Sequence, residues 1–310
     1  LESFRLVPPW NEDTIVTDVD VQFFFQSLYG IYQAPIQAGM QRQACSVMTD
    51  RGRTPLENMV ELNRLVIATW QGKDFNGTEN SYEDLVKFIK EAHKYGPEAA
   101  SVKLWIWQTC TEFGYFQSSD SGYTIFGSAA PVNLYTRVCV DVFGDMYKAV
   151  VIDKSIRKTN ELYGGRDNYE GTNAMATNGD VDPWHALGMY KSHNPSVITF
   201  LMEGAAHCND LFQPQMVNLD IVTAQTMMDK NVKKWMEQDV SSPRPRPTPT
   251  PRPTTEKTTS TPRPATTTPT RKISIQTEPT TISPTTTSKM ANYDGFIFAI
   301  FCSLVTVFWL

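Results

Sequence analysis

A change in composition near residue 240 limits where this chain can build a hydrophobic core. From Ser241 to Ser288 the sequence consists mainly of Thr, Pro and Ser, with almost no large apolar side chains outside Ile273-Ser274-Ile275. Such a segment buries too little apolar surface to offset the conformational entropy that folding removes. We therefore expect a globular region over residues 1–240 and a disordered, mucin-like, Pro/Thr/Ser-rich stalk over residues 241–289.

The last residues of the chain form an apolar run from Phe296 to Leu310. A helix that spans a bilayer needs about 20 apolar residues, and a basic anchor is expected on its cytoplasmic side. This run is shorter and has no Lys or Arg after it. We interpret residues 290–310 as the signal for a glycolipid anchor. A minimal membrane helix is the alternative, because no ideal triplet of small residues marks a cleavage site.

Charge, cysteines and one sequon indicate the cellular compartment. The formal net charge is -5, and no Lys/Arg run alternates with aromatic residues, so nucleic acid is not expected as a partner. The five cysteines and four histidines lack metal-ligand spacing. We therefore expect no metal and no cofactor. The glycosylation sequon at Asn76, with the stalk, favours an extracellular or cell-surface location, or a lysosomal-type compartment, on the secretory pathway.

Hydrophobic periodicity predicts helices in the first 95 residues. Thr54-Pro55-Leu56-Glu57 is a capping box with proline at the first helical position, followed by apolar residues at helical spacing. A second helix is predicted from Ser81 to near Gly96-Pro97. Beyond this point short apolar runs alternate with polar loops, which predicts the strands and turns of an α/β domain.

Two strands and a closing helix are predicted near the end of the globular region. The strand candidates are Gly171–Thr177 and Ser196–Met202, and the helix contains apolar residues at three- and four-residue steps from Ile221 to Trp235. Asp182 and His207 each lie on a loop after one of these strands, so both should emerge at the same edge of a sheet. An acid followed by a histidine after late strands is the order found in α/β-hydrolases.

A carboxylate and an imidazole in this order have a chemical use. In a serine triad the imidazole accepts the proton of the hydroxyl, and the carboxylate fixes its tautomer. From the residues alone the alternatives stay open, because an Asp-Pro pair commonly opens a turn and a loop histidine commonly lies at the surface.

Three motifs favour the catalytic interpretation of Asp182 and His207. Asn178-Gly-Asp-Val-Asp-Pro-Trp184, Ala205-Ala-His-Cys208 and Trp107-Gln-Thr-Cys-Thr-Glu-Phe-Gly-Tyr115 resemble the family of prolyl carboxypeptidase, dipeptidyl peptidase II and thymus-specific serine protease, and most of all its thymus-specific branch. The resemblance covers residues 15–240. It implies an α/β fold: the C-terminal part of an α/β-hydrolase domain over residues 96–240, with residues 1–95 as the end of a helical cap insert. Asp182 is then the orienting acid and His207 the base.

The resemblance also implies further site residues. Trp184 takes the place of a tryptophan that lines a pocket for a proline ring, and Tyr115 and Phe116 are candidate walls of this pocket, with core packing an equal alternative for these two. A disulfide is expected between Cys110 and Cys139.

One part of the family's pattern does not occur in the chain. The nucleophile of the family lies in a Gly-x-Ser-x-Gly elbow upstream of the insert, and no such pentapeptide is present. Residues 1–10 also lack the features of a signal peptide. We therefore expect the chain to be a C-terminal portion that is inactive by itself and folds poorly. A partner for Cys45 would lie in the missing part.

The sequence thus predicts a membrane-anchored serine exopeptidase whose substrates are peptides, with proline-containing peptides as candidates. The choice between carboxypeptidase and aminodipeptidase activity stays open. The alternative is a non-catalytic surface protein derived from such an enzyme.

Overall fold

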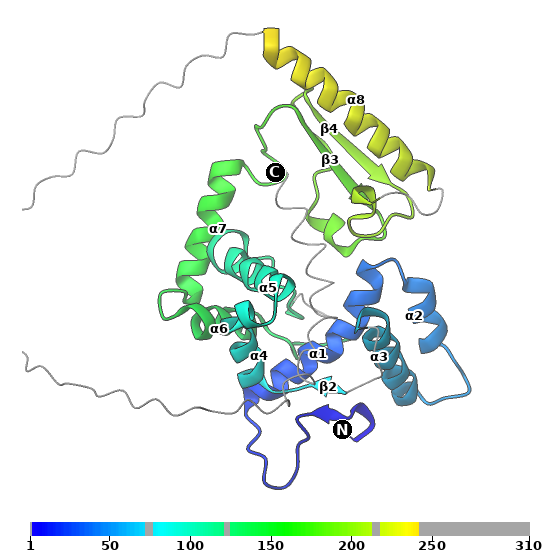
Figure 1. Ribbon diagram of the computed structural model, residues 1–310, viewed down its shortest axis with the longest axis vertical. Helices are drawn as coiled ribbons and strands as arrows, with labels where there is room; N and C mark the ends of the chain where they lie inside the picture. Colours follow the sequence, from blue (N-terminus) through cyan, green and yellow to red (C-terminus); the bar gives the residue numbers. More distant parts are fainter. Residues whose placement is uncertain (1, 72–76, 121–124, 213–217, 242–310) are drawn as a thin grey trace, which may run out of the picture.

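The computed structural model describes residues 2–71, 77–120, 125–212 and 218–241 (Figure 1). The described chain has a helical part up to residue 163 and a smaller part, residues 174–241, in which one long helix lies alongside two parallel strands (Figure 1). The predicted stalk and anchor signal lie outside the described residues.

Helices make up most of the first 95 residues, as predicted. The helices are α1 (Asp18–Gln37), α2 (Gln41–Met48), α3 (Pro55–Gln71) and α4 (Tyr82–Lys90), with short 3-10 turns at Glu2–Phe4 and Ala92–Lys94. Two short strands that the sequence analysis did not predict, β1 (Leu6–Val7) and β2 (Thr78–Glu79), pair in parallel beside them.

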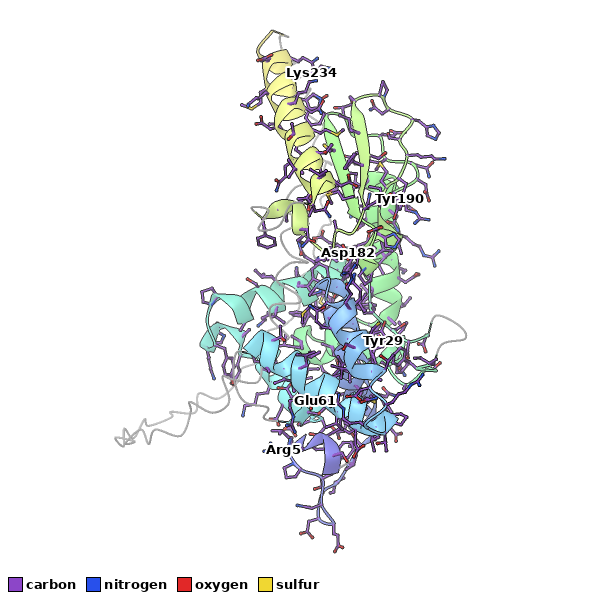
Figure 2. The ribbon with its side chains drawn as sticks, turned by 90° about the vertical axis from the view of Figure 1, so that its right-hand side faces the viewer. Arg5, Tyr29, Glu61, Asp182, Tyr190 and Lys234 are labelled. Carbon is purple, nitrogen blue, oxygen red and sulfur yellow. A yellow bond between two sulfur atoms is a disulfide. The ribbon has the colours of Figure 1, made fainter. Side chains whose placement is uncertain are left out.

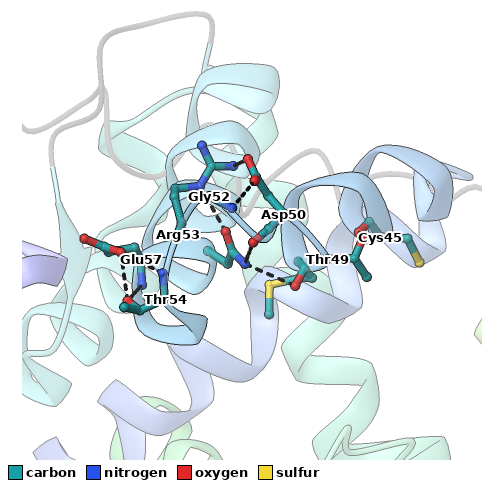
Figure 3. Close-up of polar contacts among 9 residues, drawn as sticks. Cys45, Thr49, Asp50, Gly52, Arg53, Thr54 and Glu57 are labelled. Carbon is teal, nitrogen blue, oxygen red and sulfur yellow. Dashed lines mark hydrogen bonds and ion pairs between the residues drawn. The ribbon is translucent and has the colours of Figure 1, made fainter.

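The predicted capping box starts α3. The Thr54 hydroxyl accepts a hydrogen bond from the Glu57 amide at 3.3 Å, and the Thr54 amide donates to a Glu57 carboxylate oxygen at 2.7 Å (Figure 3). The turn before the helix is held by Asn58, whose side-chain amide donates to the carbonyls of Met48 and Asp50. These bonds satisfy amides at the helix start and fix the angle between α2 and α3.

The prediction of strands directly after residue 95 is wrong. Residues 97–163 form α5 (Pro97–Gln108), a π-helical turn (Thr109–Phe113), α6 (Val132–Phe143) and α7 (Ala149–Tyr163). Pro97 occupies the first turn of α5, where its missing amide costs nothing, so the Gly-Pro pair begins a helix, whereas the helix before it, α4, already ends at Lys90. The helical part therefore extends about 70 residues beyond the predicted boundary of the cap.

Packing in the core of the helical part explains why residues 97–163 form helices. The apolar faces of α4, α5 and α6 pack on the start of α1, through residues that repeat at helical spacing along each element: Val19, Phe23, Phe88, Ile89, Val102, Leu134 and Val138. The Cys110–Cys139 disulfide joins the end of α5 to α6 and packs on Ile152 of α7. Burial of these apolar faces against neighbouring helices thus outweighs the pattern of short apolar runs from which strands were predicted.

The predicted strands and closing helix form the smaller part. β3 (Ala174–Gly179) and β4 (Val197–Met202) pair in parallel, with Ala174 opposite Val197 and Gly179 opposite Met202. α8 (Leu219–Ser241) packs on this pair, where Ile221 and Ala224 contact Met202.

A chain of buried polar groups holds the first strand of the helical part in place. The Asn63 amide donates to the Thr78 hydroxyl at 2.8 Å, and that hydroxyl donates to the Phe4 carbonyl. Asn80, which is fully buried, donates to the Pro8 carbonyl at 3.0 Å. The carboxyl group of Glu79 lies within this region, and burial, with the negative charge of Asp84, raises its pKa to about 8.

This raised pKa makes stability depend on pH. An unfolded glutamate loses its proton near pH 4.3, so between that pH and about 8 the folded state binds one more proton than the unfolded state. The free energy of unfolding should therefore fall across this window. Urea unfolding of the whole protein at pH 5, 6.5 and 8 should show that Glu79→Gln gains stability relative to the parent as pH rises. The exposed Glu12→Gln is the control, and an equal pH dependence in all three proteins would contradict the assignment.

Candidate active site

The two strands bring their following loops to one edge of the sheet. β3 and β4 are parallel and in register to their last residues, so the loops that carry Asp182 and His207 start side by side. Gly179, the last residue of β3, allows this close approach, because a Cβ atom there would lie 2.3 Å from the Ala205 carbonyl oxygen. The two loops are joined further by a hydrogen bond from the Val181 amide to the same carbonyl at 3.2 Å.

Asp182 is fixed by the start of a 3-10 helix. It is the N-cap of Pro183–Leu187, and its Oδ1 accepts a hydrogen bond from the Trp184 amide at 3.0 Å. Its other oxygen, Oδ2, accepts a hydrogen bond from Nδ1 of His207 at 2.7 Å. Asp182 as a whole residue is only 8 % exposed, and both carboxylate oxygens bind groups of the protein. Figure 2 shows Asp182 where the smaller part meets the helical part.

His207 lies on a sharply turned loop. Its backbone amide donates to the carbonyl of Gln37 at 3.1 Å, and the following residue, Cys208, has a left-handed backbone with φ of 59°. The Asn209 side chain accepts from the Ala206 amide at 2.8 Å, which closes the turn. The backbone on both sides of the imidazole is therefore fixed by hydrogen bonds.

The second nitrogen of the imidazole has no partner in the described part of the chain. A carboxylate accepts hydrogen bonds, so Nδ1 is the donor in this contact, and in a neutral imidazole Nε2 is then the acceptor nitrogen. Nε2 of His207 is buried and makes no hydrogen bond with the described residues. A buried polar atom without a partner is costly and rare, which marks this nitrogen as a place where a donor is expected.

A group of aromatic rings reaches the imidazole through Trp184. The Trp184 ring centre lies 6.0 Å from that of His207, 5.9 Å from that of Trp105 and 6.3 Å from that of Tyr115. The Phe113 ring centre lies 5.3 Å from that of Trp105 and 5.0 Å from that of Tyr115. We call these four rings, Trp105, Phe113, Tyr115 and Trp184, the aromatic group.

The predicted pocket residues divide between two places. Trp184 and Tyr115 belong to the aromatic group, but Phe116 points elsewhere: it stacks on Tyr135 at 5.8 Å and packs against the Cys110–Cys139 disulfide. The left-handed backbone at Tyr115 turns the chain between the two aromatic residues, so they face different surroundings. Core packing, the alternative left open for Phe116, is what the structure shows.

Sequence reasoning missed three neighbours of the site. Phe113 lies in the Trp107–Tyr115 motif and Trp105 lies two residues before it. Their aromatic side chains could therefore have been predicted as neighbours of the site. Gln37, at the end of α1, binds both loops of the site, and nothing in its sequence context distinguishes it from other helical glutamines.

The other predictions concern the disulfide, the partner of Cys45, the glycosylation site and metal binding. The Cys110–Cys139 disulfide is present, with Cα atoms 5.7 Å apart. Cys45 is exposed on α2 and is in no disulfide with a described residue, so its partner stays a prediction. Asn76 lies outside the described residues. Within residues 2–241, apart from the gaps given above, no group of three or more His, Cys, Asp or Glu side chains could hold a metal ion.

Comparison with known proteins finds serine proteases. The chain is 30 % identical over 258 residues to one Caenorhabditis elegans protein and 31 % identical over 217 residues to another, both provisionally named serine proteases. The matches cover 76 % and 65 % of this chain and 47 % and 42 % of those proteins. It is also 32 % identical over 110 residues to the human thymus-specific serine protease, which covers 35 % of this chain and 21 % of that protein.

The chain thus spans about half the length of these two curated relatives. No solved structure matches it significantly. A family model described as serine carboxypeptidase S28 matches residues 1–228, which include the helical part, both site loops and the start of α8. Because this match covers well over half of the 310 residues, the chain belongs to the serine carboxypeptidase S28 family.

Proposed function

We propose that this chain supplies the acid and the base of a serine exopeptidase, with Asp182 as the orienting acid and His207 as the general base. The observation that carries the proposal is the 2.7 Å bond between the two side chains, together with the buried, unpartnered Nε2 of His207. Membership of the family supports the class of serine peptidase and implies an α/β-hydrolase-like fold.

The geometry suits the chemistry of acyl transfer. Nε2 would accept the proton of a serine hydroxyl as that oxygen attacks the peptide carbonyl, and would then donate it to the leaving amine. Asp182 would hold the ring with Nε2 available and stabilise the positive charge that forms on the imidazole. A water molecule would repeat the cycle on the acyl-enzyme and release the second product.

The hydroxyl would come from a part of the protein outside these 310 residues. No Gly-x-Ser-x-Gly sequence occurs among them, and the chain matches only about half of its relatives' length. The unpartnered nitrogen of His207 fits a donor that arrives from that other part.

The aromatic group is our candidate for the substrate pocket. Trp184 offers a flat apolar face next to His207, and Tyr115 packs edge-on against Trp184. Tyr115 is 47 % exposed, so its ring is available to a ligand. A proline ring packs well on such faces, because it is compact and apolar. We therefore propose peptides cut beside proline as the substrate class, with the end that is trimmed left to experiment.

The non-catalytic alternative predicts a different result at the same residues. A descendant without activity needs no paired carboxylate and imidazole, so changes at Asp182 and His207 would alter stability alone.

Variants of the acid and the base test the proposal directly. In the whole protein, His207→Ala and Asp182→Asn should each lower kcat by about a thousandfold or more, because the hydroxyl loses its base or the base loses its orienter. Turnover of proline-containing peptides is the measurement, and thermal unfolding checks that each variant is folded. His193→Ala, on the loop before β4, is the matched control. Near-normal turnover by either folded variant would remove that residue from the triad.

Labelling with a fluorophosphonate tests the source of the serine. The whole protein should react at one serine outside these residues, and the 310-residue chain alone should not react. Labelling of the isolated chain that is lost when one of its own serines is replaced would mean that the nucleophile lies within it.

We also propose that the protein is held at the cell surface by a glycolipid at the end of a glycosylated stalk. No helix in the described part of the chain is long and apolar enough to cross a membrane. Residues 290–310, outside that part, carry the apolar run, and a stalk rich in Pro and Thr would stay extended.

A phosphatidylinositol-specific phospholipase should therefore release the protein from intact cells. The expected result is loss of the protein from the membrane fraction, and no peptide containing Trp309 in the mature protein. Retention in the membrane together with recovery of that peptide would establish a retained helix instead.

A further inference from the structure

The end of α1 contacts both loops of the candidate active site through one residue. The backbone carbonyl of Gln37 accepts from the His207 amide at 3.1 Å, and its side-chain oxygen accepts from Nε1 of Trp184 at 3.0 Å. Gln37 is only 4 % exposed, so these contacts are shielded from water. One buried residue of the helical part thus binds the loop of the acid and the loop of the base.

The contacts form a closed ring around the acid and base pair. Asp182 binds the amide of Trp184 with one oxygen and the imidazole of His207 with the other. Gln37 then joins the indole of Trp184 to the backbone of His207. Rotation of the indole or a shift of either loop would break at least one bond of this ring.

Two neighbours hold Gln37 itself in position. The side-chain amide of Gln33, one turn earlier on α1, donates to the Gln37 side-chain oxygen at 2.8 Å. Gly39, just after the helix, has φ of 75°, and a Cβ atom there would lie 3.0 Å from Cβ of Ala206. The backbone of α1 therefore lies directly against the loop that carries the base, and the glutamine is fixed before any substrate binds.

The rate of acyl transfer depends on how accurately the base is held in position. Displacement of a reacting group by about 1 Å can cost a factor of about 100 in rate. His207 must also become an imidazolium during the reaction without moving. We propose that Gln37 is a positioning residue, which keeps Trp184 and His207 in the arrangement that presents Nε2 to the serine hydroxyl. This inference rests on the proposed function.

The test compares glutamine variants in the whole protein. Gln37→Met keeps the length of the side chain and removes the acceptor for the indole, so kcat per titrated active site should fall about 10- to 100-fold, with a smaller change in KM. Gln37→Glu keeps an acceptor oxygen for the indole, so this variant should retain most of the kcat of the parent. Gln43→Met, the same replacement at an exposed position of α2, should have no effect.

Two further variants keep the test informative if Gln37→Met folds badly. Gln37→Asn withdraws the oxygen by one methylene and should lower kcat about tenfold. Trp184→Phe removes the other partner of the bond, so replacement of Gln37 should cost much less in that background than in the parent. A merely structural role would lower the yield of titratable sites and leave kcat per site unchanged.

The outcomes separate the two proposals. If the parent protein labels and turns over but every folded Gln37 variant has a kcat within twofold of it, the positioning role is overturned and the proposed function stands. If the parent shows no serine labelling and His207→Ala does not change its properties, both are overturned.

Discussion

The parallel pairing of β3 with β4 is the constraint on which the candidate site depends. Because the strands are in register to their carboxyl ends, the loops after them begin as neighbours. Gly179 then lets the chain pass against the Ala205 carbonyl, where any side chain would collide. The 2.7 Å bond between Asp182 and His207 follows from these two features of the backbone.

The smaller part does not hold this geometry alone. Gln37 of α1 and the rings of Trp105 and Tyr115 come from the helical part and pack against the loops from the other side. This division gives each part a role: the strands place the acid and base, and the helices support them and supply an aromatic surface. A substrate bound on that surface would contact residues from both parts.

Elements with a local signal were predictable. The capping box at Thr54 and the apolar repeat of α8 led to correct helices, because cap chemistry and a single buried face are written in adjacent residues. The strands around residues 174–179 and 197–202 were also found, with small errors at their ends. The helices between Pro97 and Tyr163 were missed, because their short apolar runs between polar loops were interpreted as strands, although core residues such as Leu134 and Val138 lie at helical spacing.

The sequence by itself determined the family resemblance, the residue types and order of the acid and base, the Cys110–Cys139 pairing implied by that resemblance, and the absence of a Gly-x-Ser-x-Gly elbow in the chain. Only the tertiary structure decided which aromatic residues pack around Trp184 beside His207, that Phe116 packs in the core, and that Gln37 binds both loops. The physical reason is sequence separation. Gln37 lies 147 residues from Trp184, so no local pattern records a contact that exists only because the helical part packs against the smaller part.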